Sequence, residues 1–220
     1  MRTRLSSAVL AATLTLSLSA CGVFGGDDED SGSGSSKSSA EPVAELPELT
    51  GKTTQVKVAP SFLKGLSSLG LTPGVVGKAT LKKDVLTFPI TGGKATYYKP
   101  GSRKPYVESS IEHRGSGISL TDGTTKVQLT NFTVDAGKSL LYGDVSANGK
   151  RVAKQTDLMF LDGSTLKPLQ VDKDEKTGVL QGTTVSLTKD AAKLLDKTYR
   201  TKGLKPFFKV GVATITLALP

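Results

Sequence analysis

The sequence predicts a mainly β domain, built as a β-sandwich or a flattened barrel that carries two short helices. Glycine-containing turn signals recur along the chain, and the runs between them alternate or are rich in β-branched residues, as in hairpins. Only two segments have the apolar spacing of a helix. The turn signals are Thr91-Gly92-Gly93, Asp122-Gly123, Asn148-Gly149 and Asp162-Gly163.

The first 20 residues have the three parts of an export signal. Arg2 and Arg4 form a short positive leader, and an apolar run over 8–18 follows it. This run is shorter than the about 20 apolar residues that a membrane-spanning helix needs. Small residues then stand directly before the only cysteine, in Leu18-Ser19-Ala20-Cys21.

This opening segment resembles the bacterial lipoprotein signal and its lipobox, as in actinobacterial-type lipoproteins. The resemblance implies that residues 1–20 are removed and that the Cys21 thiol receives a diacylglycerol. Acyl chains would then hold the protein on the extracytoplasmic face of the cell membrane. The alternative is an ordinary secretory signal with an unrelated cysteine. A lipidated Cys21 leaves no thiol for a disulfide, a metal or catalysis.

The lipidated cysteine is expected to begin a flexible tether, 21–45, in which Gly, Ser and acidic residues dominate. A segment with so few apolar side chains cannot bury enough surface to fold. One β-rich domain is expected over 46–220, which is long enough for a sizeable core.

Within this domain, strands are expected over 85–90, 125–134, 139–145 and 210–219, and helices over 60–69 and 189–201. The second helix starts after Thr188, a residue type that caps helices. Its Ala191, Leu194 and Leu195 recur at spacings that form one apolar face.

Two parts of the domain share one order of elements. Val56-Lys57-Val58 precedes a helical stretch and "GLTPGVVGKAT", and Val185-Ser186-Leu187 precedes a helical stretch and "GLKPFFKVGVAT". The similarity predicts an internal pseudo-two-fold repeat of a strand–helix–strand unit, with the two Val-Gly-x-Ala-Thr strands paired. The alternative is that similar turns produced similar strings by chance.

Positive charge is concentrated in the expected domain. Residues 46–220 contain 26 basic and 14 acidic residues, a net charge of about +12. On an exported protein this charge favours anionic envelope polymers or lipid headgroups as partners, and export argues against nucleic acid. A solvated helix face is the alternative. The cations expected to make the contact are Lys189, Lys193, Lys197, Arg200 and Lys202.

The residues needed for catalysis or metal binding are sparse. His113 is the only histidine, no Gly-x-Ser-x-Gly elbow is present, and no cluster of His and Cys could hold a metal. We therefore expect neither an enzyme nor a metal site. A hydrolase with an unrecognised site is the remaining alternative, and it would need His113 beside a carboxylate and a hydroxyl.

Two stretches carry a family resemblance that covers most of 84–217. "TFPITGGKA" with "SSIEHRGSGISLTDGTTKVQLTNFTVDAGKSLLYGDVSANG" is similar to the middle of haem-transport-associated (Hta-type) β-domains of actinobacterial surface proteins. "TTVSLTKDAAKLLDKTYRTKGLKP" is similar to their close. The resemblance implies an extracytoplasmic β-rich fold and, in some members, haem binding through a tyrosine and a histidine.

The chain departs from that family at the residues that would bind haem. "PSFLKGLSSLG" has no tyrosine where the family has one, and "TDGT" has no histidine. The resemblance therefore implies the fold without the family's haem site.

The function expected from these observations is a membrane-anchored, non-catalytic module that binds or organises envelope components and needs no cofactor. The alternative is a small-ligand module, with haem as the named ligand and His113 and Tyr106 as its contacts. An apolar cavity in the folded domain would favour the second reading, because small-ligand carriers have one.

Overall fold

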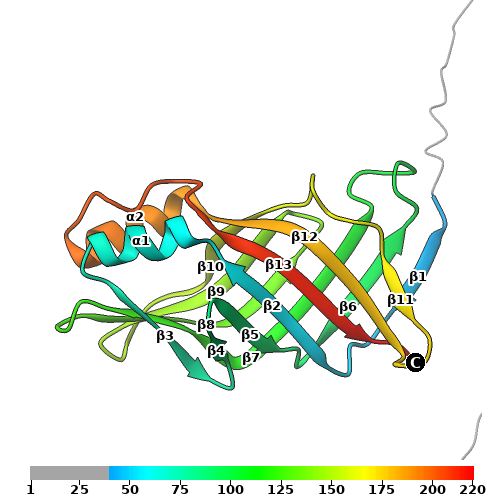
Figure 1. The fold of residues 1–220 in the computed structure, drawn as a ribbon, viewed down its shortest axis with the longest axis horizontal. Helices are drawn as coiled ribbons and strands as arrows, with labels where there is room; N and C mark the ends of the chain where they lie inside the picture. Colours follow the sequence, from blue (N-terminus) through cyan, green and yellow to red (C-terminus); the bar gives the residue numbers. More distant parts are fainter. Residues whose placement is uncertain (1–39) are drawn as a thin grey trace, which may run out of the picture. The chain divides into compact units, whose positions relative to one another are not determined.

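One sheet of thirteen strands, curled into a half-barrel, forms the fold in this computed structural model (Figure 1). The structure describes residues 40–220, so Cys21 and the expected leader lie outside the described residues. Every strand pair is antiparallel, and the main order is β1-β6-β7-β8-β9-β10-β12-β13-β2-β5-β4, with β3 on β7 and β11 on β12. The mainly β fold with two helices is as the sequence predicts.

The elements follow one another along the chain as β1 (Pro42–Leu46), β2 (Lys52–Val58), α1 (Pro60–Ser68), β3 (Thr72–Gly77), β4 (Thr80–Lys82), β5 (Val85–Pro89), β6 (Gly92–Tyr98), β7 (Val107–Thr121), β8 (Lys126–Asp135), β9 (Leu140–Ala147), β10 (Lys150–Asp162), β11 (Gln170–Asp172), β12 (Thr177–Leu187), α2 (Lys189–Tyr199) and β13 (Lys209–Ala218).

A row of bulges bends the sheet across β7, β8, β9 and β10. The register shifts after His113 in β7, after Thr130 in β8 and after Ala153 in β10. Asp144 holds the bent strands together, because its carboxylate accepts hydrogen bonds from the Asn131 side chain and from the Gln155 backbone, both at 3.0 Å. Bulges increase local twist, so a row of them curls the sheet and gives it a concave face.

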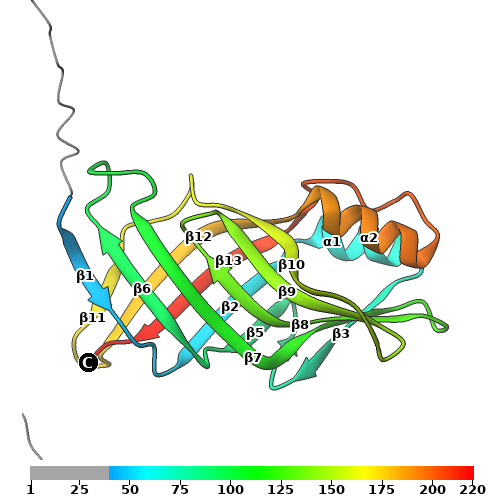
Figure 2. The ribbon, with the colours of Figure 1, turned by 180° about the vertical axis from the view of Figure 1, so that it is seen from behind.

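Both helices lie at one end of the curled sheet, and the C-terminus lies at the other (Figures 1 and 2). Thr188 caps α2 as expected, since its Oγ1 accepts from the backbone N–H of Ala191 at 3.1 Å. Ala191 and Leu195 are buried, and the Tyr199 hydroxyl donates to the Leu120 carbonyl of β7 at 2.7 Å. None of the helices within 40–220 has the length and apolar character required to cross a membrane.

The structure corrects two expectations from the sequence: the pairing of the repeated segments and the start of the domain. The expected pairing of the two Val-Gly-x-Ala-Thr segments is wrong, because the second lies within β13, which pairs with β12 and β2, while the first spans the turn between β3 and β4. The repeat is thus limited to the strand–helix units β2–α1 and β12–α2. The domain also starts earlier than residue 46, because β1 already pairs with β6 from Pro42 onward.

Candidate functional site: an apolar cavity and the recess beside it

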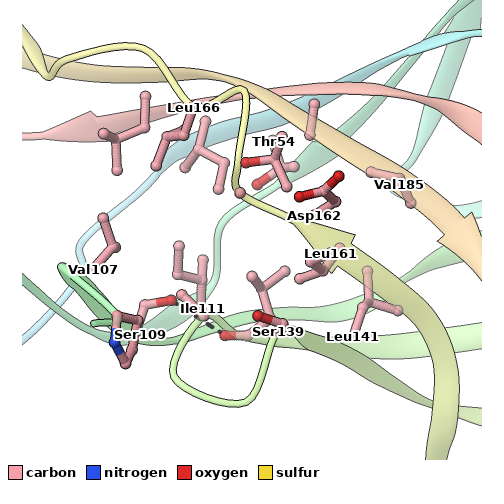
Figure 3. Close-up of a pocket in the computed structure, with 18 of the residues that line it drawn as sticks. Thr54, Val107, Ser109, Ile111, Ser139, Leu141, Leu161, Asp162, Leu166 and Val185 are labelled. Carbon is pink, nitrogen blue, oxygen red and sulfur yellow. Dashed lines mark hydrogen bonds between the residues drawn. The ribbon is translucent and has the colours of Figure 1, made fainter.

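The concave face of the sheet encloses a cavity of about 350 Å³ (Figure 3). Alternate residues of β2, β7 and β13 line it, because successive side chains of a strand point to opposite faces. Val107, Ser109 and Ile111 come from β7, and Thr54 and Val56 come from β2. Thr54 and Val56 lie on the wall opposite β7, beside Ala213, Ile215 and Leu217 of the neighbouring β13 and Leu180, Thr183 and Val185 of β12.

A bulge at Gly182 keeps β12 facing the cavity at both of its ends. The lining residues change from an even position, Leu180, to an odd one, Thr183, across a register shift between Gln181 and Thr183. Gly182 has φ 111°, and a Cβ there would collide with the Thr165 carbonyl oxygen. Only glycine suits this position.

The segment over 163–169 crosses the same bulge and borders the cavity. The Thr165 hydroxyl donates to the Gly182 carbonyl at 2.6 Å, and the Lys167 N–H donates to the Gln181 carbonyl at 2.9 Å. Leu166 lines the cavity, and its carbonyl accepts from the Tyr106 hydroxyl at 3.4 Å. We call this segment, 163–169, the strap.

The cavity offers few polar groups and little charge. Among the described residues that line it, the only charged side chain is Asp162, and no lysine, arginine or histidine takes part. Hydrogen bonds from Ser164 lower the pKa of Asp162, so this group is an anion at neutral pH. Burial and, to a smaller extent, Tyr97 raise the pKa of Tyr106, which keeps its phenol protonated. The cavity therefore suits a neutral apolar occupant better than an anion.

A smaller recess of about 50 Å³ adjoins the cavity and contains His113. The two spaces share the side chains of Thr54, Val56, Val134, Leu141 and Val185. His113 follows Ile111 on the same face of β7, so the recess continues the line of cavity residues along that strand. The rest of its wall is apolar, including Phe88 and Phe132.

Two residues that line this recess each have one buried polar atom without a hydrogen-bond partner within the described part of the chain: His113 Nε2 and Thr54 Oγ1. His113 is 1% exposed and Thr54 is 6% exposed. Burial lowers the pKa of His113, although its bond to the Pro89 carbonyl opposes this shift, so the ring is neutral at pH 7. Its Nδ1 lies 2.9 Å from that carbonyl and must carry the proton, which leaves Nε2 as an acceptor.

The two ligand contacts expected from the sequence are not brought together. Tyr106 lines the cavity and His113 lines the recess, and the six residues between them all lie in the extended strand β7, which separates the two by about 23 Å. They cannot ligate one iron atom as a pair. For the hydrolase alternative, Thr54 is a hydroxyl residue that lines the recess with His113, but no carboxylate is among the described residues that line it.

The five cations expected to contact an anionic surface are all exposed: Lys189, Lys193, Lys197, Arg200 and Lys202. The ion pairs found over 40–220 join other residues: Arg103 with Glu108, Arg114 with Glu112, and Lys138 with Asp135. The same part of the chain contains no group of three or more His, Cys, Asp or Glu that could hold a metal ion.

Sequence reasoning missed the cavity and the buried, unpartnered hydroxyl of Thr54. The signal was present in the alternation of Val107, Ser109 and Ile111 and of Ala213, Ile215 and Leu217, which marks one face of two strands. That this face encloses an open space follows from the curl of the sheet, which the alternation does not reveal.

Comparison with known proteins finds solved structures with a similar fold. No protein-family model matches the sequence, and no curated protein matches it. Among solved structures, the C-terminal domain of HtaA from Corynebacterium glutamicum is similar, with a TM-score of 0.52 and 15% identity over 77% of this chain and 97% of that domain. Heme binding protein HtaB from the same organism has a TM-score of 0.45 and 14% identity over 80% of this chain and 96% of its own. The chain shares the fold of the HtaA domain, as the Hta-type resemblance implied.

Proposed function

We propose that this chain is a non-catalytic, small-ligand-binding module of the cell surface, whose cavity takes a neutral apolar molecule. The observation that carries the proposal is the cavity of about 350 Å³ on the concave face, with mainly apolar walls and no lining cation among the described residues. Its volume lies within the range of about 300–1,000 Å³ found for ligand pockets.

Cavity-filling substitutions test this proposal. Ala95 and Ala213 are buried and line the cavity, so Ala95→Leu and Ala213→Leu would place added carbons inside it. We expect each change to weaken binding of an apolar fluorescent probe to the full chain at least tenfold without loss of thermal stability. The matched control is Ala153→Leu, because Ala153 is half-buried in β10 and does not line the cavity. Equal probe binding by the wild type and both filled variants would overturn the proposal.

Haem is the first specific ligand to test, because the sequence resembles Hta-type domains. The residues present fit it poorly. Tyr106 is the cavity side chain with an oxygen of the kind that ligates haem iron, but its raised pKa disfavours the phenolate form. The cavity also lacks a lining cation that could pair with haem carboxylates.

A titration with hemin decides the matter. We expect no shift of the Soret band beyond that caused by apolar adsorption, and no difference between the wild type and Tyr106→Phe. A shift that Tyr106→Phe abolishes would establish haem as the ligand instead.

The location of the module follows from the lipoprotein reading of Cys21, which we propose on the sequence of 1–21 alone. Mass spectrometry of the native protein tests it. We expect a mature chain that begins at Cys21 and carries a diacylglycerol on its thiol, and an unmodified thiol would contradict it.

A second role, contact with an anionic surface, is favoured by the cations of α2 and the following loop. Lys193 and Lys197 stand one turn apart on an exposed helix face, and Lys202 continues the same charge. Binding to vesicles that contain anionic lipid should weaken with salt and with Lys193→Glu plus Lys197→Glu. Lys150→Glu plus Lys154→Glu, on the exposed start of β10, is the control of equal charge change. Equal loss in both double variants would indicate attraction by net charge alone.

A further inference from the structure

The loop that connects α2 to β13 has an exposed phenylalanine at the tip of a turn. The Phe208 N–H donates to the Lys205 carbonyl at 3.2 Å, which closes a turn with Pro206 and Phe207 at its centre. Phe207 has φ 58°, and proline followed by a residue of positive φ is typical of a type II turn, which favours glycine at that second central position. A bulky side chain in this conformation strains the backbone.

The packing around Phe207 does not account for an aromatic ring at this position. Phe207 is 65% exposed, the largest fraction among the large apolar side chains of 40–220. Its neighbour Phe208 holds the loop, because the Phe208 ring packs on Phe62 of α1 with centroids 5.4 Å apart. The Phe207 ring meets Phe160 of β10 edge to face at 6.1 Å, and Phe160 is itself 36% exposed. We call Phe160 and Phe207 the aromatic tip.

Positive charge surrounds the aromatic tip. Lys209 lies in one row with Ser186 and Phe160 across β13, β12 and β10, so its backbone is about 10 Å from that of Phe160. The Lys205 Nζ donates to the Lys202 carbonyl at 3.0 Å, and this bond leaves its charge without an anionic partner. The loop over 200–209 contains no acidic residue and four cations, none of which joins the ion pairs found over 40–220: Arg200, Lys202, Lys205 and Lys209.

An exposed aromatic tip among lysines suits the surface of an anionic lipid bilayer. Aromatic side chains favour the headgroup region, and lysine stems allow the ammonium groups to reach the headgroups. The two acidic residues that flank Phe160 in β10, Asp157 and Asp162, offset only part of the positive charge.

The apolar area of the tip is too small for a stable protein interface. The exposed parts of the two rings together amount to about one whole aromatic side chain, roughly 150–250 Å². A stable protein–protein interface buries about 800 Å² on each partner. A bilayer, in contrast, can take up a single ring.

We propose that the aromatic tip enters the surface of an anionic lipid bilayer, with the Phe207 ring inserted and Lys205 and Lys209 beside the headgroups. The inference deepens the second proposed role, contact with an anionic surface, because it names the bilayer and the side chain that enters it. Phe160 also lines the cavity, so the substitutions that test the tip are confined to Phe207 and its lysines.

A single tryptophan reports on the insertion, because the chain contains none. The full chain with Phe207→Trp is mixed with vesicles of phosphatidylcholine and phosphatidylglycerol, with or without bromine on the acyl chains. We expect the emission to move to shorter wavelength and to be quenched by the brominated lipid. Val171→Trp is the matched control, because Val171 is 52% exposed and lies in β11, far from the helices (Figure 1). Its emission should not change, and equal quenching in both variants would overturn the inference.

Charge reversal beside the tip should weaken the insertion. In the chain with Phe207→Trp, we add Lys205→Glu plus Lys209→Glu. The lipid concentration that gives half of the spectral change should rise at least tenfold, since each cation near an anionic membrane strengthens binding about fivefold. Lys150→Glu plus Lys154→Glu is the control of equal charge change and should have a much smaller effect. Equal effects would overturn a local contact at the tip.

Phe207→Gly tests whether the ring serves the fold instead. Glycine suits the positive φ of this turn, so the midpoint of denaturant unfolding without lipid should stay the same or rise. A clear fall would assign the ring to packing on Phe160 and would overturn the inference.

The outcomes separate this inference from the role that it deepens. If vesicles bind the chain in a salt-dependent manner but the emission of Phe207→Trp is unchanged, the contact with an anionic surface remains and insertion alone is overturned. If the vesicles do not bind, both fail. If soluble polyglutamate changes the emission as much as vesicles do, the partner is an anionic polymer and the bilayer is overturned.

Discussion

His113 Nδ1 and the Pro89 carbonyl oxygen lie 2.9 Å apart, and this hydrogen bond fixes the state of the only histidine in the chain. The bond joins β7 to the end of β5, two strands that are not neighbours in the sheet. It holds the ring between Phe88 and the recess, with ring centroids of Phe88 and His113 6.1 Å apart. The neutral, Nδ1-protonated ring follows from this contact and from burial.

The pKa of His113 predicts how stability depends on pH. Its folded-state pKa is below the ordinary value of 6.5, so the unfolded chain binds the proton more readily. The contribution of the neutral His113 ring to the free energy of unfolding is complete above about pH 7. It is lost as the pH falls below 6.5 toward the folded-state pKa, by at most about 1.4 kcal/mol per pH unit. Thermal unfolding of the full chain between about pH 7.5 and 5 measures this slope. His113→Asn should flatten it, and an unchanged slope would contradict the assignment.

Removing the unpartnered hydroxyl of Thr54 should stabilise the ligand-free protein. Thr54→Val replaces a buried group without a hydrogen bond by a methyl group of similar shape, so we expect a gain of about 1 kcal/mol in the free energy of unfolding. Denaturant titration measures it, with Thr183→Val as the comparison. A loss of stability in Thr54→Val would show that the hydroxyl has a partner in solution.

The strap should loosen when Gly182 acquires a side chain. Gly182→Ala adds a Cβ against the Thr165 carbonyl oxygen at a residue with φ 111°, and we expect a loss of about 1–3 kcal/mol together with weaker probe binding in the cavity. Gly163→Ala, in the same strap, is the matched control, because no heavy atom lies within 4 Å of its added Cβ. Similar losses from both substitutions would disprove a specific contact at the bulge.

The cap of α2 should contribute measurably to stability. The Thr188 hydroxyl accepts from the Ala191 N–H and donates to the Asp157 carbonyl at 2.8 Å, so Thr188→Ala removes two hydrogen bonds. We expect the free energy of unfolding to fall by about 1–2 kcal/mol. Thr188→Ser keeps the hydroxyl and should cost much less. If serine and alanine are equally destabilising, packing of the threonine methyl group explains the effect.

Local patterns predicted the elements of this fold well. Thr188 marked the start of α2, and the Asn148-Gly149 turn separates β9 from β10 as a hairpin signal should. These predictions succeeded because each depends on the backbone conformation of a few adjacent residues. The edge strand β1 was missed, because its Glu41–Glu45 surroundings have the acidic composition of the tether and its pairing with β6 is a long-range contact.

The candidate site was predictable only in part. His113 and Tyr106 were both identified, but their separation depends on where β7 begins, which the sequence did not locate. Thr54 looked like any threonine of an alternating strand. Its importance arises from burial without a partner, a property of the packed sheet rather than of its own neighbours in the chain.

The pairing of β1 with β6 also determines which N-terminal truncations leave the sheet edge covered. β1 covers the outer edge of β6 over Ala95–Tyr98, where backbone N–H and C=O groups would otherwise be free. An expression fragment that begins at residue 46 would bare this edge, and bared edges recruit strands from other molecules. Such a fragment should self-associate more readily than one that begins at residue 40 and keeps the short β1.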